Sequence, residues 1–136
     1  MGAYDVDSVT IDGGPVALGT AGSLTVTLDR PAGAGGSGRG FSGGQLLNLA
    51  VAACISNDLH REAVKRRLRL TRVAVHVRSD DGGDLVVSTP ITYDVEVAGE
   101  AEAALLDLVA HVDRIAEIPN SLRGGTAVLL GGVRTG

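Results

Sequence analysis

The first third of the chain contains two stretches with the character of β-strands, and in the second of them hydrophobic and polar residues alternate. Residues 4–11 are rich in β-branched side chains, and Gly13-Gly14-Pro15 interrupts them. In residues 23–29, Leu24, Val26 and Leu28 alternate with Thr25, Thr27 and Asp29. Such alternation gives a strand one apolar and one polar face, as in antiparallel sheets. The pattern therefore predicts two strands, of which the second has one face in solvent.

A long apolar helix is predicted next. Residues 32–40, Ala-Gly-Ala-Gly-Gly-Ser-Gly-Arg-Gly, have the composition of a flexible linker. After it, Ser42 and Gln45 form a capping-box pattern that starts a helix, and nothing breaks it before about residue 67. The first half of this helix is apolar on nearly all sides, which means burial on most faces. One sheet supplies too little cover for such a helix in so small a domain, so we expect a second subunit to cover it.

The second half of the chain predicts a hairpin, a helix and a final strand. In residues 72–78, three valines face inward and Ala74 and His76 face outward. An acidic, glycine-containing turn at 80–84 leads to a return strand over residues 85–97.

An amphipathic stripe then predicts a helix over residues 100–116, which Pro119 is expected to end. A last strand is expected over residues 126–133. Long hairpins without strand–helix alternation indicate an α+β fold with antiparallel sheet structure.

Composition narrows the possible functions. The 136 residues suit a single domain spanning residues 1–136. Aromatic residues make up 2%, so few rings are present to stack on bases, and the net charge of −4 argues against a nucleic-acid partner. The N-terminal residues show no signal peptide, and no apolar run is long enough to span a bilayer. We therefore expect a cytoplasmic protein without a membrane partner.

Several short motifs match known sites but lack the required context. Gly33-x-Gly35-x-x-Gly38 fits a dinucleotide-binding fingerprint, but the strand before it has a polar face. Gly40-x-Ser42-x-Gly44 fits a nucleophile elbow, but a glycine linker stands where a central strand is needed. The three histidines show no ligand spacing. Neither a cofactor nor a metal is predicted.

The single cysteine, Cys54, lies in the middle of the most apolar stretch. One thiol excludes an internal disulfide and a cysteine-rich metal site. A cysteine in an apolar helix is most often an inert core residue. Asp58, one turn away, would oppose thiolate formation, whereas Arg61 would favour it from about two turns, roughly 10 Å. The residues alone leave open whether Cys54 is reactive or inert.

Two segments resemble the OsmC/Ohr family. Residues 43–54, Gly-Gly-Gln-Leu-Leu-Asn-Leu-Ala-Val-Ala-Ala-Cys, resemble a helix that in this family typically reads Pro-Glu-x-Leu, then small residues, then Ala-Cys. Residues 118–126, Ile-Pro-Asn-Ser-Leu-Arg-Gly-Gly-Thr, resemble the family's Cys-Pro-x-Ser-x-x-x-Gly-Asn region. Spacing and element order agree from about residue 23 to the end of the sequence.

This resemblance implies an intertwined homodimer, with antiparallel sheets wrapped around paired long central helices and the thiol near the subunit interface. In organic hydroperoxide resistance proteins, a first cysteine activated by an Arg–Glu pair becomes a sulfenic acid, and a second cysteine condenses with it. By the resemblance Cys54 matches the first cysteine, Ile118 stands at the second, and Gly44 stands at the glutamate. Arg30 and Arg39 are candidates for the arginine if the linker folds back.

The implied function is stress defence by thiol-dependent reduction of organic hydroperoxides through Cys54. The activity is expected to be impaired, because the second cysteine and the glutamate are missing. Cys54 would work as a one-cysteine thiol peroxidase of peroxiredoxin-like activity, with an external thiol as reductant. Leu47 and Val51 would line an apolar pocket for the substrate. The alternative is a catalytically inactive member that binds a small hydrophobic ligand at the dimer interface.

Overall fold

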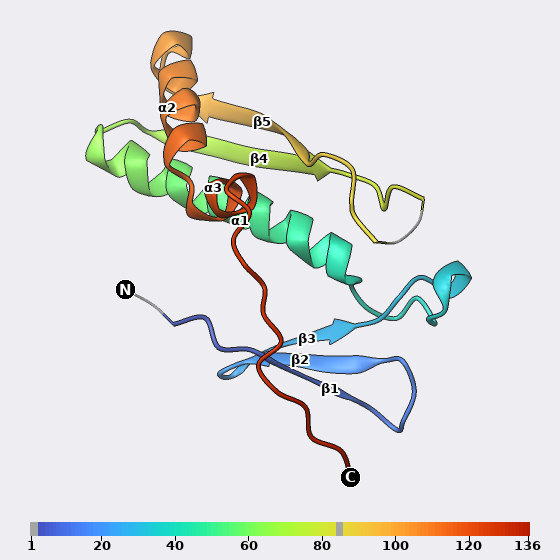
Figure 1. Ribbon diagram of the computed structural model, residues 1–136. Coiled ribbons are helices and arrows are strands. Elements are labelled where there is room, and N and C mark those ends of the chain that lie inside the picture. Colours follow the sequence, from blue (N-terminus) through green and yellow to red (C-terminus); the bar gives the residue numbers. More distant parts are fainter. Residues whose placement is uncertain (1–2, 84–85) are drawn as a thin grey trace. The chain divides into compact units, whose positions relative to one another are not determined.

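The computed structural model describes residues 3–83 and 86–136 and has an α+β fold with two antiparallel sheets, as the sequence predicts (Figure 1). The chain divides into two compact units. The first unit comprises Met1–Leu49 and Ser79–Pro90, and the second comprises Ala50–Arg78 and Ile91–Gly136. A long helix, α1 (Gly43–Lys65), begins in the first unit and ends in the second.

The first unit contains a three-stranded antiparallel sheet in the order β1 (Asp7–Thr10), β2 (Ala17–Ala21), β3 (Leu24–Leu28). The sequence predicts β1 and β3 but not β2, whose small residues carry a weak alternation. Strand β2 pairs antiparallel with both β1 and β3, and its central residue is Gly19. A Cβ on Gly19 would lie 3.1 Å from side-chain atoms of both Val26 and Leu28, so these side chains occupy the space above the glycine.

The glycine-rich segment after β3 is organised by one carboxylate. Asp29 accepts hydrogen bonds from the N–H groups of Arg30 (2.8 Å), Ser37 (3.0 Å) and Arg39 (3.0 Å), and from the Ser37 hydroxyl (2.5 Å). These bonds, that from the Ser37 hydroxyl foremost, lower the pKa of Asp29 to about 2. A short 3₁₀ turn, η1 (Ala32–Ala34), lies within the segment. The flexibility of residues 32–40 stays a prediction, but hydrogen bonds to Asp29 hold the backbone at both ends of the segment.

Both ends of α1 are closed by local hydrogen bonds. At the start, Ser42 N–H donates to Gln45 Oε1 (2.9 Å) and Gln45 N–H donates to Ser42 Oγ (3.3 Å), which confirms the predicted capping box. At the end, Arg67 takes a left-handed conformation with φ of 56°, and Leu68 N–H donates to Ala63 O at 2.9 Å. This Schellman closure places the last helical residue at Lys65.

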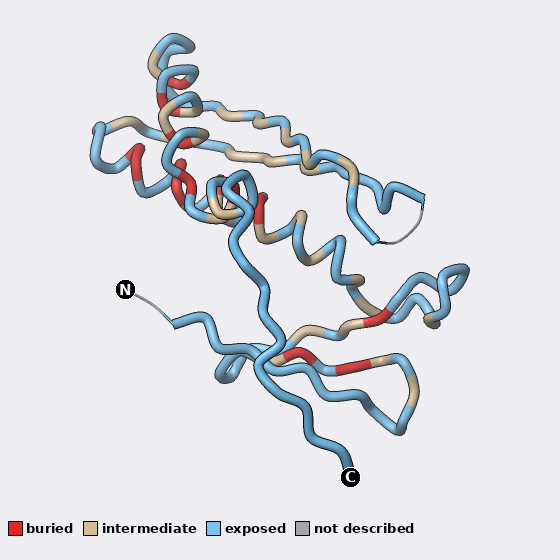
Figure 2. Tube along the Cα trace, viewed as in Figure 1, coloured by how far each residue is buried: buried red, intermediate tan, exposed pale blue. Residues whose placement is uncertain are grey.

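The second unit contains a hairpin covered on one face by helices. Its strands, β4 (Leu70–Arg78) and β5 (Thr92–Gly99), pair antiparallel. The helices α2 (Glu102–Ile115) and α3 (Glu117–Arg123) follow. Figure 2 shows the buried residues of this unit gathered on the helices. The core cluster consists of Ile55, Leu59, Ala63, Leu108, Val112 and Ala116, with Val73, Val75, Tyr93 and Val95 of the hairpin packed against it.

Of the three valines expected to face inward, Val73 and Val75 pack against the core cluster and Val77 is half-buried. The outer face of the hairpin is polar. His76 is exposed, and two cross-strand ion pairs lie on the same face. They join Arg72 to Glu96, at 3.4 Å, and Arg78 to Asp94. Exposed pairs of this kind contribute little to stability, so the apolar inner face holds the hairpin to the helices.

A hydrogen-bonded network fixes α3. Asp113 of α2 accepts hydrogen bonds from the Tyr93 hydroxyl of β5 and from Arg123 of α3, whose Nη2 lies 2.7 Å from Asp113 Oδ1. Burial and the Asp113 carboxylate raise the pKa of Tyr93 to about 12. Asp113 therefore links three elements of the second unit.

Three sequence predictions for the second half are wrong in detail. The return strand begins at Thr92 rather than at residue 85, which lies outside the described residues. Pro119 does not end helical structure: Ala116 interrupts it, with φ of −65° and ψ of 124°, and α3 then starts. Pro119 occupies the first turn of α3, where a missing N–H costs no intrahelical bond.

The strand predicted over residues 126–133 does not form within the chain. These residues pair with no strand among the described residues, and Val128, Leu129 and Leu130 are 95%, 85% and 84% exposed. An extended apolar segment becomes a strand only where a free sheet edge receives it.

The Leu108→Ala substitution tests the core of the second unit. Leu108 is fully buried, so removing its side chain is expected to lower the free energy of unfolding by about 2–5 kcal/mol. The matched control on the same helix is Leu106→Ala, because Leu106 is 61% exposed and its truncation should change stability within about 0.5 kcal/mol. Urea denaturation of both variants measures the difference, and equal losses would contradict this core.

Candidate functional site around Cys54

Cys54 lies on α1 at the margin of the second unit's core. Its thiol is free and half-buried, and it packs against the core cluster. Ile55, the next residue, is 1% exposed, whereas Asn57 on another side of the helix is exposed. The sulfur is therefore positioned between an apolar interior and a polar helix face.

A buried carboxylate contacts the sulfur. Asp58, one turn after Cys54, is 8% exposed, and its Oδ2 lies 4.0 Å from Cys54 Sγ, which donates the hydrogen bond. Its Oδ1 lies 3.1 Å from Nη1 of Arg61, one turn further along. The i, i+4 and i, i+3 spacings on a helix bring these three side chains onto one face.

Glu62 extends this face into a charge network. It is 6% exposed and is contacted by Arg61 Nε (3.0 Å), Lys65 Nζ (2.8 Å) and His111 Nε2 (2.8 Å). Its contacts with Lys65, His111 and Arg61, in that order, lower the pKa of Glu62 to about 2. Because His111 belongs to α2, the network also joins the two helices. Hydrogen bonding to Glu62 and the charge of Asp58 raise the pKa of Arg61.

The sequence anticipates part of this site. It places Asp58 and Arg61 on the face of Cys54, and the structure brings all three together. It does not anticipate that Arg61 is shared between two carboxylates. Glu62 and His111 were missed because their pairing joins positions 49 residues apart, and no local pattern signals such a contact.

The two residues expected to bind substrate lie in different environments. Leu47 is 37% exposed and lines a pocket of the first unit. Val51 belongs to the second unit and is 2% exposed, so it presents almost no surface to a ligand in this chain. Neither Val51 nor Cys54 is among the residues that line that pocket. A substrate-binding role for Leu47 and Val51 stays a prediction.

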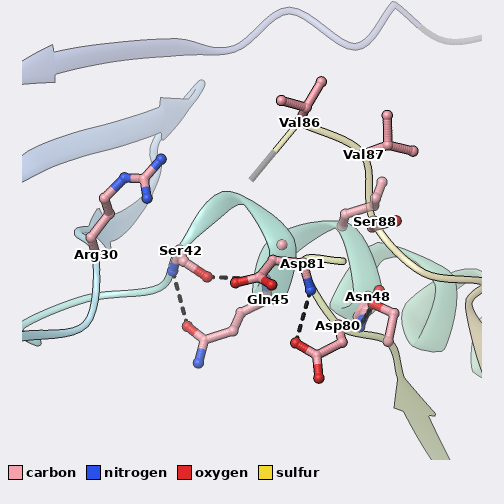
Figure 3. Close-up of a pocket in the computed structure, with 12 residues that line it drawn as sticks. Arg30, Ser42, Gln45, Asn48, Asp80, Asp81, Val86, Val87 and Ser88 are labelled. Carbon is pink, nitrogen blue, oxygen red and sulfur yellow. Dashed lines mark hydrogen bonds between the residues drawn. The ribbon is translucent and has the colours of Figure 1, made fainter. Parts of the chain in front are cut away.

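The pocket that includes Leu47 has a volume of about 390 Å³ and mixed polar and apolar walls. Figure 3 shows Arg30 and Ser42 on one side of it and Val86, Val87 and Ser88 on the other. Asn48 of α1 donates to the Ser79 hydroxyl at 2.9 Å, which fixes α1 to the loop that follows β4. The pocket is lined by Arg30, Ser42, Gly44, Gln45, Leu47, Asn48, Ser79, Asp80, Asp81, Val86, Val87 and Ser88.

Two positions singled out by the sequence resemblance meet in this pocket. Arg30 and Gly44 both line it, and a Cβ on Gly44 would meet no atom within 4 Å. Arg39 instead contributes its backbone N–H to Asp29. Arg30 is therefore the arginine candidate that shares a pocket with the position of the family's glutamate.

Among residues 3–83 and 86–136, no three His, Cys, Asp or Glu side chains are gathered so as to hold a metal ion. None of the helices described combines the length and apolar character needed to cross a membrane.

Comparison with known proteins identifies the family. Residues 35–130 match the family described as OsmC-like protein, so the chain belongs to the OsmC-like protein family. No curated protein matches the sequence.

Solved structures share the fold at low sequence identity. An OsmC-like protein from Mycoplasma pneumoniae is 18% identical, with 90% of this chain and 89% of that chain covered and a TM-score of 0.77. An organic hydroperoxide resistance protein OsmC from Legionella pneumophila is 20% identical, with 91% of each chain covered and a TM-score of 0.69. The organic hydroperoxide resistance protein OhrB of Bacillus subtilis is 20% identical, with 90% and 91% covered and a TM-score of 0.64.

The Glu62→Gln substitution tests the charge network. A lowered carboxylate pKa stabilises the folded state above the unfolded value near 4.5, and this stabilisation is lost as the pH falls from about 4.5 towards 2. Glu62→Gln should therefore unfold at lower urea concentration than the wild type at pH 7, and the difference should shrink across that acid range. Asp107→Asn, at an exposed position of α2, is the control and should show no such trend. A Glu62→Gln deficit that is constant with pH would contradict the assignment.

Proposed function

We propose that this protein takes part in defence against oxidative stress as a one-cysteine thiol peroxidase that reduces organic hydroperoxides through Cys54. The proposal rests on family membership and on the placement of the only thiol. Cys54 lies on the helix that carries the family resemblance, half-buried, with its sulfur against a buried carboxylate–guanidinium pair. Two structures with the same fold are named as organic hydroperoxide resistance proteins.

The reaction needs one thiol and an external reductant. The sulfur attacks the distal oxygen of the hydroperoxide, the S–O bond forms as the O–O bond breaks, and the products are a sulfenic acid and an alcohol. The sequence contains no second cysteine, and by the family resemblance Ile118, which lies on α3, stands at its position. The sulfenic acid therefore condenses with a small thiol, releasing water, and a second thiol restores Cys54. Without the family's resolving cysteine and glutamate, turnover is expected to be slower than in two-cysteine enzymes.

The Cys54→Ser substitution tests this function. Wild-type protein with excess dithiothreitol should consume cumene hydroperoxide, and Cys54→Ser should lower the rate to that of buffer with reductant. Dimedone added with the peroxide should label the wild type once, at Cys54. Wild-type protein that neither consumes the peroxide nor takes up the label would overturn the peroxidase proposal.

We also propose that the protein is a homodimer. The first unit exposes many apolar side chains, and residues 127–133 form an exposed apolar tail of the second unit. Among them Val6 is 71% exposed, Leu24 is 73% exposed and Leu129 is 85% exposed. Exposed apolar surface of this extent is typical of an interaction site. A second copy is the proposed occupant, because the tail has the composition of a strand and none of the strands described in residues 3–83 and 86–136 pairs with it.

Dimerisation can be measured directly. Light scattering should give a mass about twice the 13.8 kDa of one chain. The double substitution Leu129→Asp/Leu130→Asp places charges on both sides of the tail and should reduce the mass to that of one chain. Thr135→Asp, a polar position near the end of the sequence, is the control and should leave the dimer intact. A monomeric wild type at micromolar concentration, or a dimeric double variant, would contradict the proposal.

A binding function is the second candidate, and one observation favours it. A pocket of about 420 Å³ lies on the three-stranded sheet and is mainly apolar. Its lining is Val6, Asp7, Ser8, Gly19, Thr20, Ala21, Leu24, Thr25, Val26, Leu28 and Leu46. Such a pocket suits a small hydrophobic ligand. If Cys54 is inert towards hydroperoxide, this pocket carries the function instead.

A further inference from the structure

By the family resemblance, Gly44 stands where the glutamate would be, and Arg61 is held by the carboxylates of Asp58 and Glu62. The proton of the Cys54 thiol therefore needs another acceptor. Asp58 is the group in contact with the sulfur. We propose that Asp58 is a catalytic proton relay, which accepts the thiol proton as the sulfur attacks the hydroperoxide and passes it to the leaving alkoxide. This inference rests on the proposed peroxidase function and assigns a role that the family's Arg–Glu pair does not provide here.

The geometry divides the two oxygens of Asp58 between two tasks. Oδ1 is 3.1 Å from Arg61 Nη1, and Oδ2 receives the hydrogen bond from Cys54 Sγ at 4.0 Å. Arg61 is held in turn by Glu62, whose other contacts are Lys65 and His111. The network therefore anchors one oxygen and directs the other to the thiol. Catalytic hydrogen bonds are often long in a free protein and shorten when substrate binds.

A purely electrostatic role for Asp58 would slow the reaction of Cys54 instead of assisting it. A carboxylate beside a sulfur disfavours the thiolate, so a purely electrostatic Asp58 would suppress the reactivity of Cys54. A relay avoids this problem, because the neutral thiol reacts and loses its proton during the attack.

The step balances in atoms and electrons. Two electrons pass from sulfur to the peroxide bond, the distal oxygen with its hydrogen becomes the S–OH group, and the proximal oxygen leaves as an alkoxide. The thiol proton moves to Asp58 Oδ2 and then to the alkoxide, which becomes the alcohol. The alkoxide is a far stronger base than a carboxylate, so proton transfer from Asp58 to the alkoxide is strongly favourable. This makes the overall transfer from the thiol to the alkoxide favourable. Asp58 ends the step ionised, as it began.

Two reactions of Cys54 separate a relay from an electrostatic effect. Reduction of cumene hydroperoxide releases an alkoxide that needs a proton, whereas alkylation by iodoacetamide releases iodide, which needs none. For Asp58→Asn we expect the hydroperoxide rate to fall about 100-fold, because general acid–base groups contribute at least that factor. Alkylation should become faster in the same variant, because a negative charge next to the sulfur has been removed.

Two further variants complete the experiment. Asp58→Glu keeps a carboxylate within one methylene of its place and should recover part of the hydroperoxide rate. Asp107→Asn, the same chemical change on the exposed face of α2, should leave both rates unchanged.

The outcomes distinguish the relay role of Asp58 from the peroxidase function itself. A fall in hydroperoxide reduction together with faster alkylation supports the relay. Any other combination of the two rates in Asp58→Asn, such as both faster or both slower as a disturbed helix would cause, overturns the relay while the peroxidase stands. A wild type that is inert towards hydroperoxide but alkylated at Cys54 overturns the proposed function, and the relay with it.

Discussion

Burial of the second half of α1 against α2 and the β4–β5 hairpin is the interaction on which the second unit depends. Leu59 and Leu108 are both 0% exposed at the centre of this contact. The same packing determines the surroundings of Cys54. When one face of α1 packs in the core, the adjacent face lies at the edge of the core, next to solvent. Asp58 and Glu62 lie at that margin, where they are buried enough to need partners and near enough to solvent to find cations. The chemistry proposed for the thiol thus follows from how the helix packs.

The two units differ in how much of their apolar surface they bury. The second unit has a closed core, apart from its extended tail. The first unit has a sheet whose strand β1 is exposed throughout and whose buried residues are few. Such a sheet is marginal alone, since three strands need a covered face to be stable. The second unit therefore buries most of its apolar helix faces within itself, whereas the first unit leaves much of its apolar surface exposed.

The elements specified by local signals are those the sequence predicts well. Ser42 and Gln45 start α1 through bonds that span three residues, and the valines of β4 mark their own inner face. Signals that depend on distant residues fail. Strand β2 depends on pairing with β1 and β3 on its two sides, and Pro119 fits the first turn of α3 because Ala116 has already interrupted the helix.

The candidate site shows the same division. Cys54, Asp58 and Arg61 are neighbours by helix periodicity, so sequence reasoning places them on one face. The contact of Glu62 with His111 arises only when α1 and α2 pack, and it changes the part played by Arg61 from a free cation to a shared one. The sequence shows which residue types are present, but their ion-pair partners could be identified only from the folded structure.

The single carboxylate of Asp29 has a consequence for how this chain tolerates change. Because it gathers the backbone of residues 30, 37 and 39, the two ends of the glycine-rich loop stay together whatever lies between them. The cost of closing a loop rises only slowly with its length. Insertions or deletions near residues 33–35 should therefore leave the start of α1 in place, and related proteins are free to vary there in length while the helix that carries the thiol keeps its register.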